Sequence, residues 1–114
     1  MKTNIEIQTQ ENANTALIQV SGEVDMSTSN KLREALLNVI KKKKDTVVVN
    51  LEKINYIDSS GLATLVEGLQ NTKHYKGAFK LILKNPKILD ILKLARLNQI
   101  FEIFESMEAA KVNL

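Results

Sequence analysis

The order in which two apolar patterns alternate along the chain limits its fold more than any other feature. Short runs with period-two or continuous apolar character, typical of strands, alternate with i, i+3, i+4 stripes, typical of amphipathic helices. The expected strands cover residues 4–8, 16–20, 46–51, 78–83 and 100–104. The apolar stripes of the expected helices are Leu32, Ala35, Leu36, Val39 and Ile40 in the first, Leu62, Leu65, Val66 and Leu69 in the second, and Ile88, Leu89, Ile91 and Leu92 in the third.

Capping and turn residues predict where these elements begin and end. Serine, aspartate and asparagine side chains cap helix N-termini, proline suits the first helical position, and glycine permits a change of direction. The expected boundaries are a turn at 11–14, a strand end at Ser21-Gly22, helix starts at 27–29, 58–61 and Asn85-Pro86, a helix end at Lys76-Gly77, and a short terminal helix at 106–112.

The resulting order, β-β-α-β-α-β-α-β-α, predicts an α/β fold. Strands that alternate with helices pair in parallel through right-handed crossovers, and the first two strands are close enough to form an antiparallel hairpin. We therefore expect a mixed, mostly parallel sheet of about five strands with helices packed against it. A chain of 114 residues fits a single domain, 1–114.

Composition excludes several classes of function. The chain has no cysteine, which excludes disulfides, thiolate metal sites and a thiol nucleophile. Its net charge of +3 is spread along the chain without interleaved aromatics, so we expect no direct nucleic-acid binding. The densest basic run, Lys41 to Lys44, is expected to be a solvated helix terminus, with a phosphate- or partner-binding patch as the alternative. No segment resembles a signal peptide or a membrane span, so we expect a soluble, cytoplasmic protein.

The sequence contains few residues that could form a catalytic or metal-binding site. Phosphate-binding loops, nucleophile elbows and zinc-protease motifs are all absent from the sequence. The only histidine, His74, would lie about 20 Å from Ser59 along the same helix, too far for a general base. Glu23 and Asp25 are close in sequence, but no further residues converge with ligand spacing. We expect no enzyme activity, no metal and no cofactor.

The segment Asp58-Ser59-Ser60-Gly61 connects a buried strand to an amphipathic helix. Hydroxyls at this position lie beside outward-pointing backbone N–H groups. In a purely structural interpretation, Ser59 caps the helix, Asp58 favours its positive end and Gly61 relieves crowding. A serine at an exposed corner is also accessible to modification, and phosphorylation adds roughly −1.5 to −2 charges.

Two motifs together resemble the STAS family, in particular its bacterial anti-sigma factor antagonists. One is Asp58-Ser59-Ser60-Gly61-Leu62, which follows the strand Val47-Val48-Val49-Asn50-Leu51 and Tyr56-Ile57. The other is Gly22-Glu23-Val24-Asp25, followed by the first helix. The order of elements also agrees, so the resemblance extends over nearly the whole chain. One departure is Ala63, where many members have glycine; alanine favours the helix but adds a methyl group where a partner helix would approach.

The resemblance implies a binding protein and not an enzyme. Such members bind an anti-sigma factor that is also an ATP-dependent serine kinase, and thereby release the sigma factor. The kinase phosphorylates the first serine of the motif, here Ser59, and a PP2C-type phosphatase reverses the modification. The residues implied in partner binding around it are Asp58, Ser60, Gly61, Asp25 and Glu23.

Three other functions stay open from the sequence. The nearest is a STAS subunit of a stress-signalling or lipid-transport complex, without phosphorylation at Ser59. Another is nucleotide binding by the domain itself, suggested by the helix N-terminus and nearby lysines. A hydrolase that uses Ser59, His74 and Asp58 ranks last, because a catalytic triad requires hydrogen-bond contact.

Overall fold

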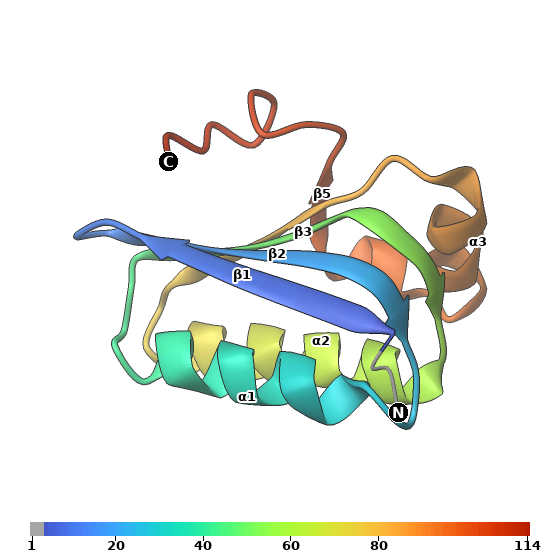
Figure 1. Ribbon diagram of the computed structural model, residues 1–114. Coiled ribbons are helices and arrows are strands. Elements are labelled where there is room, and N and C mark those ends of the chain that lie inside the picture. Colours follow the sequence, from blue (N-terminus) through green and yellow to red (C-terminus); the bar gives the residue numbers. More distant parts are fainter. Residues whose placement is uncertain (1–3) are drawn as a thin grey trace.

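The computed structural model describes residues 4–114, which form one five-stranded sheet in the order β1-β2-β3-β4-β5 (Figure 1). β1 and β2 pair antiparallel, and the remaining neighbours pair in parallel. This arrangement confirms the predicted mixed, mostly parallel α/β sheet. The elements are β1 (Ile5–Glu11), β2 (Thr15–Val24), α1 (Ser29–Ile40), β3 (Thr46–Ile57), α2 (Ser59–His74), β4 (Ala78–Ile82), α3 (Pro86–Leu94), the 3-10 helix η1 (Leu97–Gln99) and β5 (Glu102–Phe104).

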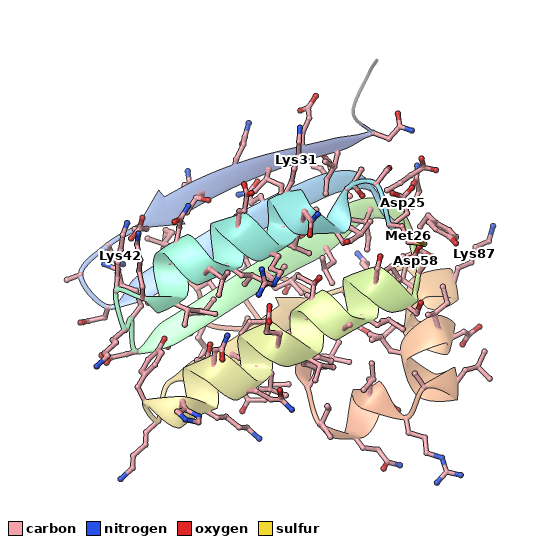
Figure 2. All side chains as sticks on the ribbon, turned by 90° about the horizontal axis from the view of Figure 1, so that it is seen from below. Asp25, Met26, Lys31, Lys42, Asp58 and Lys87 are labelled. Atoms are coloured by element: carbon pink, nitrogen blue, oxygen red, sulfur yellow. The ribbon has the colours of Figure 1, made fainter. Side chains whose placement is uncertain are left out.

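Helices cover one face of the sheet and the C-terminal segment covers part of the other (Figure 1). α1 and α2 lie side by side beneath the strands, and β1 extends beyond α1 (Figure 2). The main core lies between these helices and the sheet and is built from aliphatic residues and two phenylalanines, Phe79 and Phe101. A second, smaller cluster on the opposite face contains Leu17, Val48, Ile82 and Ala110, with Phe104, Met107 and Val112 packed against it. Within residues 4–114, no helix is both long and apolar enough to cross a membrane.

The predicted terminal helix at 106–112 is wrong. These residues form successive turns that end where Lys111 adopts a left-handed φ of 60°. The Lys111 N–H donates to the Glu108 carbonyl and the Val112 N–H to that of Met107, both at 3.0 Å. Such a pair of bonds closes a helix C-terminus. The segment is therefore stopped after a single turn.

Three predicted strand boundaries also differ from the structure. β2 does not end at Ser21-Gly22 but continues to Val24, through register shifts in its pairing with β3. Gly22 has a φ of 102°, and a Cβ there would lie 2.1 Å from the Asn4 carbonyl oxygen, so glycine lets the strand continue. β3 extends six residues past Leu51, and the last strand is shortened to three residues by η1.

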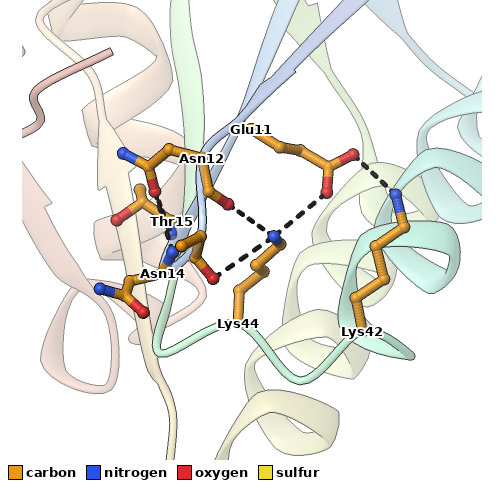
Figure 3. A network of polar contacts seen from close by, with 7 residues as sticks. Glu11, Asn12, Asn14, Thr15, Lys42 and Lys44 are labelled. Atoms are coloured by element: carbon orange, nitrogen blue, oxygen red, sulfur yellow. Dashed lines mark hydrogen bonds and ion pairs between the residues drawn. The ribbon is translucent and has the colours of Figure 1, made fainter.

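The basic run after α1 fastens the β1–β2 hairpin to the adjacent loop (Figure 3). Lys42 Nζ lies 2.8 Å from one Glu11 carboxylate oxygen, and Lys44 Nζ lies 3.7 Å from the other. Lys44 Nζ also donates to the Asn12 carbonyl at 2.6 Å. The Glu11 pKa is lowered, chiefly by its hydrogen bond with Lys42. The expected solvated helix terminus is confirmed for Lys41, Lys42 and Lys43, which are exposed, whereas Lys44 is partly buried. Lys42 and Lys44 in addition connect the loop to the hairpin.

Candidate functional site

The site predicted from the two motifs lies where β2 and β3 end side by side. Val24 and Ile57 are register partners, and the Asp58 N–H donates to the Val24 carbonyl at 3.0 Å. Because the strands are parallel, the loop after β2 and the start of α2 lie at the same end of the sheet, beyond the C-terminal ends of β2 and β3. The two motifs, more than thirty residues apart in the chain, thus form one surface (Figure 2).

Asp58 is the N-cap of α2. Its Oδ1 accepts bonds from the Ser60 N–H at 2.9 Å, the Ser60 hydroxyl at 2.6 Å and the Gly61 N–H at 3.3 Å. The pKa of Asp58 is lowered, first by the Ser60 hydroxyl and then by backbone N–H groups that include that of Met26. Met26 belongs to the loop after β2, so the Asp58 carboxylate lies near that loop as well as at the helix terminus.

Asp25 organises the neighbouring loop in a similar way. Its Oδ1 accepts bonds from the Ser27 N–H at 2.9 Å and the Ser27 hydroxyl at 2.7 Å. The Ser27 hydroxyl is the main cause of a lowered Asp25 pKa. The Thr28 hydroxyl donates to the Glu23 carbonyl at 2.8 Å and accepts from the Asp25 N–H at 2.9 Å. The Asp25 carboxylate is therefore a second ionised group at the same end of the sheet as Asp58.

The two serines of the motif differ in exposure and bonding. Ser60 is partly buried and its hydroxyl is bound to Asp58. Ser59 is exposed as the first residue of α2, and its hydroxyl makes no hydrogen bond within the described residues 4–114. The expectation that Ser59 caps the helix is therefore wrong, because Asp58 is the cap. Of the two serines, Ser59 is the one whose hydroxyl is exposed and free of hydrogen bonds within residues 4–114.

Gly61 brings α2 close to the sheet. A Cβ at this position would lie 2.6 Å from Ile57 Cγ1 and 2.7 Å from Val24 Cγ1, nearer than real Cβ atoms approach. The residue is buried, so it lies beneath the surface and does not form part of it. Glu23, by contrast, is a partly exposed residue of β2 and pairs with Tyr56 of β3. Ala63 lies on the exposed side of α2.

The sequence analysis did not identify two exposed apolar residues at this end of the sheet as part of the candidate site. Met26 is 82% exposed in the loop after β2, and Tyr56 is 46% exposed near the end of β3. A methionine in the polar loop after Glu23-Val24-Asp25, outside any helix stripe, was the available signal. Met26 and Tyr56 thus add apolar surface to the end of the sheet that carries Asp58, Asp25 and Glu23.

The residues considered for catalysis are not brought together. His74 is exposed and is the last residue of α2, at the opposite end of the helix from Ser59. Among residues 4–114, no group of three or more histidine, cysteine, aspartate or glutamate side chains is arranged to hold a metal ion. At this end of the sheet, the exposed Ser59 hydroxyl lies at the start of α2 next to the Asp58 carboxylate.

Comparisons with known proteins agree with this fold. A profile of the STAS domain matches residues 4–110. The curated anti-sigma-B factor antagonist of Staphylococcus aureus is 32% identical over 114 residues, which cover 99% of this chain and 94% of the relative.

Solved structures show the same fold. The crystal structure of an anti-sigma factor antagonist from Mycobacterium paratuberculosis aligns with a TM-score of 0.84 and 22% identity, over 91% of this chain and 88% of that one. The Bacillus cell fate determinant SpoIIAA in its phosphorylated form aligns with a TM-score of 0.72 and 19% identity, over 93% and 97% of the two chains. The family match over nearly the whole chain and the 32% identical relative show that this protein belongs to the STAS domain family.

Proposed function

We propose that this protein is an anti-sigma factor antagonist that is switched off by phosphorylation of Ser59. In this role it acts in the cytoplasm as a regulator and not as an enzyme. The proposal is supported by the name of the Staphylococcus aureus relative and by one observation above all. Ser59 is the exposed serine at the start of α2, whereas the hydroxyl of Ser60 is held by Asp58.

The proposed partners are an anti-sigma factor that is also a serine kinase, and a PP2C-type phosphatase. The partner surface comprises the acidic residues Asp58, Asp25 and Glu23, with Met26 as an apolar contact between them. Ser60 and Gly61 contribute from beneath the surface, since one orients the Asp58 carboxylate and the other lets α2 approach the sheet.

The proposed switch is electrostatic. A phosphate on Ser59 adds roughly −1.5 to −2 charges beside two carboxylates whose pKa values are already lowered, so all three groups are ionised near neutral pH. The N-terminus of α2 tolerates this charge, so the domain stays folded. The partner, however, meets an unpaired dianion, and a loss of about 3–4 kcal/mol weakens binding several hundredfold.

The test combines mass spectrometry with binding measurements. Tandem mass spectrometry of the protein isolated from its native cells is expected to find phosphate on Ser59, and none on the Ser59→Ala variant. Phosphorylated protein should bind its anti-sigma factor several hundredfold more weakly than unmodified protein. Ser106→Ala is the control, because it removes a serine hydroxyl in the C-terminal segment, outside the proposed partner surface, and should leave phosphorylation at Ser59 in place.

Three results would count against the proposal. Equal binding of both forms would rule out the switch. Absence of phosphate across several growth conditions would favour a STAS scaffold subunit in a stress-signalling or lipid-transport complex. Nucleotide-dependent thermal stabilisation of the isolated protein would instead favour a nucleotide-binding domain.

A further inference from the structure

A cluster of lysines lies at the end of the sheet opposite the candidate functional site. It comes from two connections, residues 41–45 after α1 and residues 73–77 at the end of α2, which together contain a single acidic residue. Its members are Lys41, Lys42, Lys43, Lys44, Lys73 and Lys76. Figure 2 shows Lys42 at this basic end of the molecule and Asp58 at the other end. The proposed partner surface lies at the Asp58 end, so the basic end has no part in it.

The two connections lie side by side. Thr46 and Ala78, which follow them, are register partners in parallel strands, and the Ala78 N–H donates to the Asp45 carbonyl at 2.8 Å. The ion pair between Arg33 of α1 and Glu67 of α2, at 2.7 Å, fixes the relative height of the two helices. Each of these two residues lies seven positions before the end of its helix, so the two C-terminal ends reach the same level. The six lysines therefore belong to one surface.

Four of these lysines make no ion pair within residues 4–114. Lys42 and Lys44 pair with Glu11 of the hairpin. The four others are exposed, and the ion pairs of the described chain do not include them. They are Lys41, Lys43, Lys73 and Lys76. Asp45 is the one acidic residue in the two connections and cannot balance four cations, so the basic end keeps a positive charge.

Two of the four lysines lie where the backbone favours glycine. Lys43 has a φ of 54° and Lys76 a φ of 68°, in the left-handed region. The helix dipole accounts for Lys73, in the last turn of α2, but its effect falls off beyond that turn. A side chain at a left-handed position adds strain that glycine would avoid, and such strain is found most often at functional sites. The fold alone therefore does not explain lysine at these two positions.

We propose that the basic end binds the surface of a membrane rich in anionic phospholipids. The lysine ammonium groups contact the lipid phosphates, and each lysine near such a surface strengthens binding about fivefold. The large apolar side chains that are exposed in the described chain, such as Met26 and Leu94, all lie outside the two connections. The association is therefore electrostatic and superficial, and salt weakens it.

The residue types favour a lipid surface over a nucleic acid. All the cations in the cluster are lysines, which act as hydrated point charges, whereas arginine provides the planar fork that reads base edges. Single-stranded nucleic acids also stack on exposed aromatic rings. Tyr75, the only aromatic residue in the two connections, is partly buried, and its hydroxyl oxygen is shielded from solvent. A flat anionic surface requires neither a fork nor a stacking ring.

This mode of binding leaves the candidate functional site uncovered. α2 has 16 residues and is about 24 Å long, and its C-terminal end belongs to the basic end. Ser59, at the start of the helix, therefore faces away from the membrane. The inference does not depend on the proposed switch, because the lysines bind whether or not Ser59 is modified.

Co-sedimentation with lipid vesicles tests the inference. The probe is a vesicle of equal parts phosphatidylglycerol and phosphatidylcholine, and vesicles of phosphatidylcholine alone are the neutral reference. We expect binding to the anionic vesicles at about 0.1 M salt and release at about 1 M, since the Debye length falls from about 10 Å to about 3 Å. No binding to the anionic vesicles at the lower salt concentration, or equal binding to both kinds of vesicle, would overturn the proposal.

Two double variants with the same net charge locate the surface. Lys43→Gln with Lys73→Gln removes two lysines of the basic end and should weaken vesicle binding about 25-fold. Lys31→Gln with Lys87→Gln removes two exposed lysines at the starts of α1 and α3, which Figure 2 shows away from Lys42. This control should change binding less than about twofold, because these lysines lie beyond the Debye length. Equal losses for the two pairs would show that only net charge matters, against the proposal.

Lys76→Gly separates binding from folding. It removes one cation but relieves the left-handed strain, so it should bind the anionic vesicles about fivefold more weakly while unfolding at a higher temperature. Unchanged vesicle binding by this variant would contradict the role of Lys76. A labelled single-stranded oligonucleotide is the final probe. If it bound more tightly than the vesicles, and Lys43→Gln with Lys73→Gln abolished that binding, the partner would be a nucleic acid and the proposal would be wrong.

Discussion

Asp58 shows how one carboxylate can serve both the fold and the candidate site. Its side chain caps α2 through Ser60 and Gly61, and its backbone N–H donates to the Val24 carbonyl at the end of β2. An ionised carboxylate at a helix N-terminus interacts favourably with the helix dipole. The charge that stabilises α2 is therefore the same charge that would repel a phosphate on Ser59.

This arrangement predicts a pH-dependent contribution to stability. Because the folded-state pKa of Asp58 is lowered, its contribution is fully present above its unfolded-state pKa of about 3.9 and is lost as the pH falls through the folded-state pKa. Asp58→Asn keeps a capping side chain but removes the charge. We expect it to lower the free energy of unfolding by about 0.5–1 kcal/mol at pH 7.

The difference should be measured by urea unfolding at several pH values. It is expected to shrink towards zero in acid, where Asp58 of the wild type is protonated. Asp90→Asn, at an exposed position of α3, is the matched control and should change stability little at either pH. A constant difference between wild type and Asp58→Asn across this range would show that the charge does not act as argued.

At the scale of secondary structure, several turns and helix ends share an unusual feature. Each has a basic residue in the left-handed conformation, where glycine is the usual choice. These residues are Lys43, Lys76, Arg96 and Lys111, with φ between 54° and 68°. A cation suits the negative end of a helix, but a side chain in this conformation costs about 1–2 kcal/mol.

Lys76→Gly is therefore expected to stabilise the protein. Relief of the backbone strain should outweigh the lost cation and raise the free energy of unfolding by about 0.5–1 kcal/mol. Lys73→Gly, the same substitution inside the last turn of α2, is the control and should lower it by about 1 kcal/mol. Thermal unfolding would measure both, and a decrease for Lys76→Gly would contradict the argument.

At the scale of the whole molecule, the two faces of the sheet are covered by different means. α1 and α2 cover one face, whereas residues 105–114, which form no helix, cross the other (Figure 1). Lys80 holds this C-terminal segment, because its Nζ donates to the Ala110 carbonyl at 2.8 Å and lies 5.4 Å from the Phe104 ring centroid. Beneath it, Leu17 and Val48 are fully buried.

Removal of residues 106–114 should expose this second apolar cluster. The loss of Met107, Ala110 and Val112 is expected to lower the free energy of unfolding by about 2–5 kcal/mol, as for other buried side chains that lose their packing. Urea unfolding would measure the change, and a dye that binds exposed apolar surface should report it. Removal of residues 113–114 alone is the control, and equal effects of both truncations would contradict this role for the segment.

Local signals account for the features that could be predicted from the sequence. Apolar periodicity predicted the order of strands and helices up to β5, and the hairpin followed from the short turn between β1 and β2. The start of α2 between Asp58 and Gly61 was predictable because capping depends on neighbours a few residues away. The wrong terminal helix has the same origin, since local propensity carries no information about where Lys111 turns the chain.

The sequence by itself determined the α/β class, the element order and the accessible start of α2, because periodicity and capping act over one or two turns. Only the tertiary structure decided which separate segments meet. It brought Asp58 beside Val24 at the end of β2, paired Lys42 and Lys44 with the hairpin, and placed the C-terminal segment across Leu17 and Val48. These contacts join residues roughly thirty or more positions apart in the chain, and their energies depend on how strands pair and pack, which no local pattern encodes.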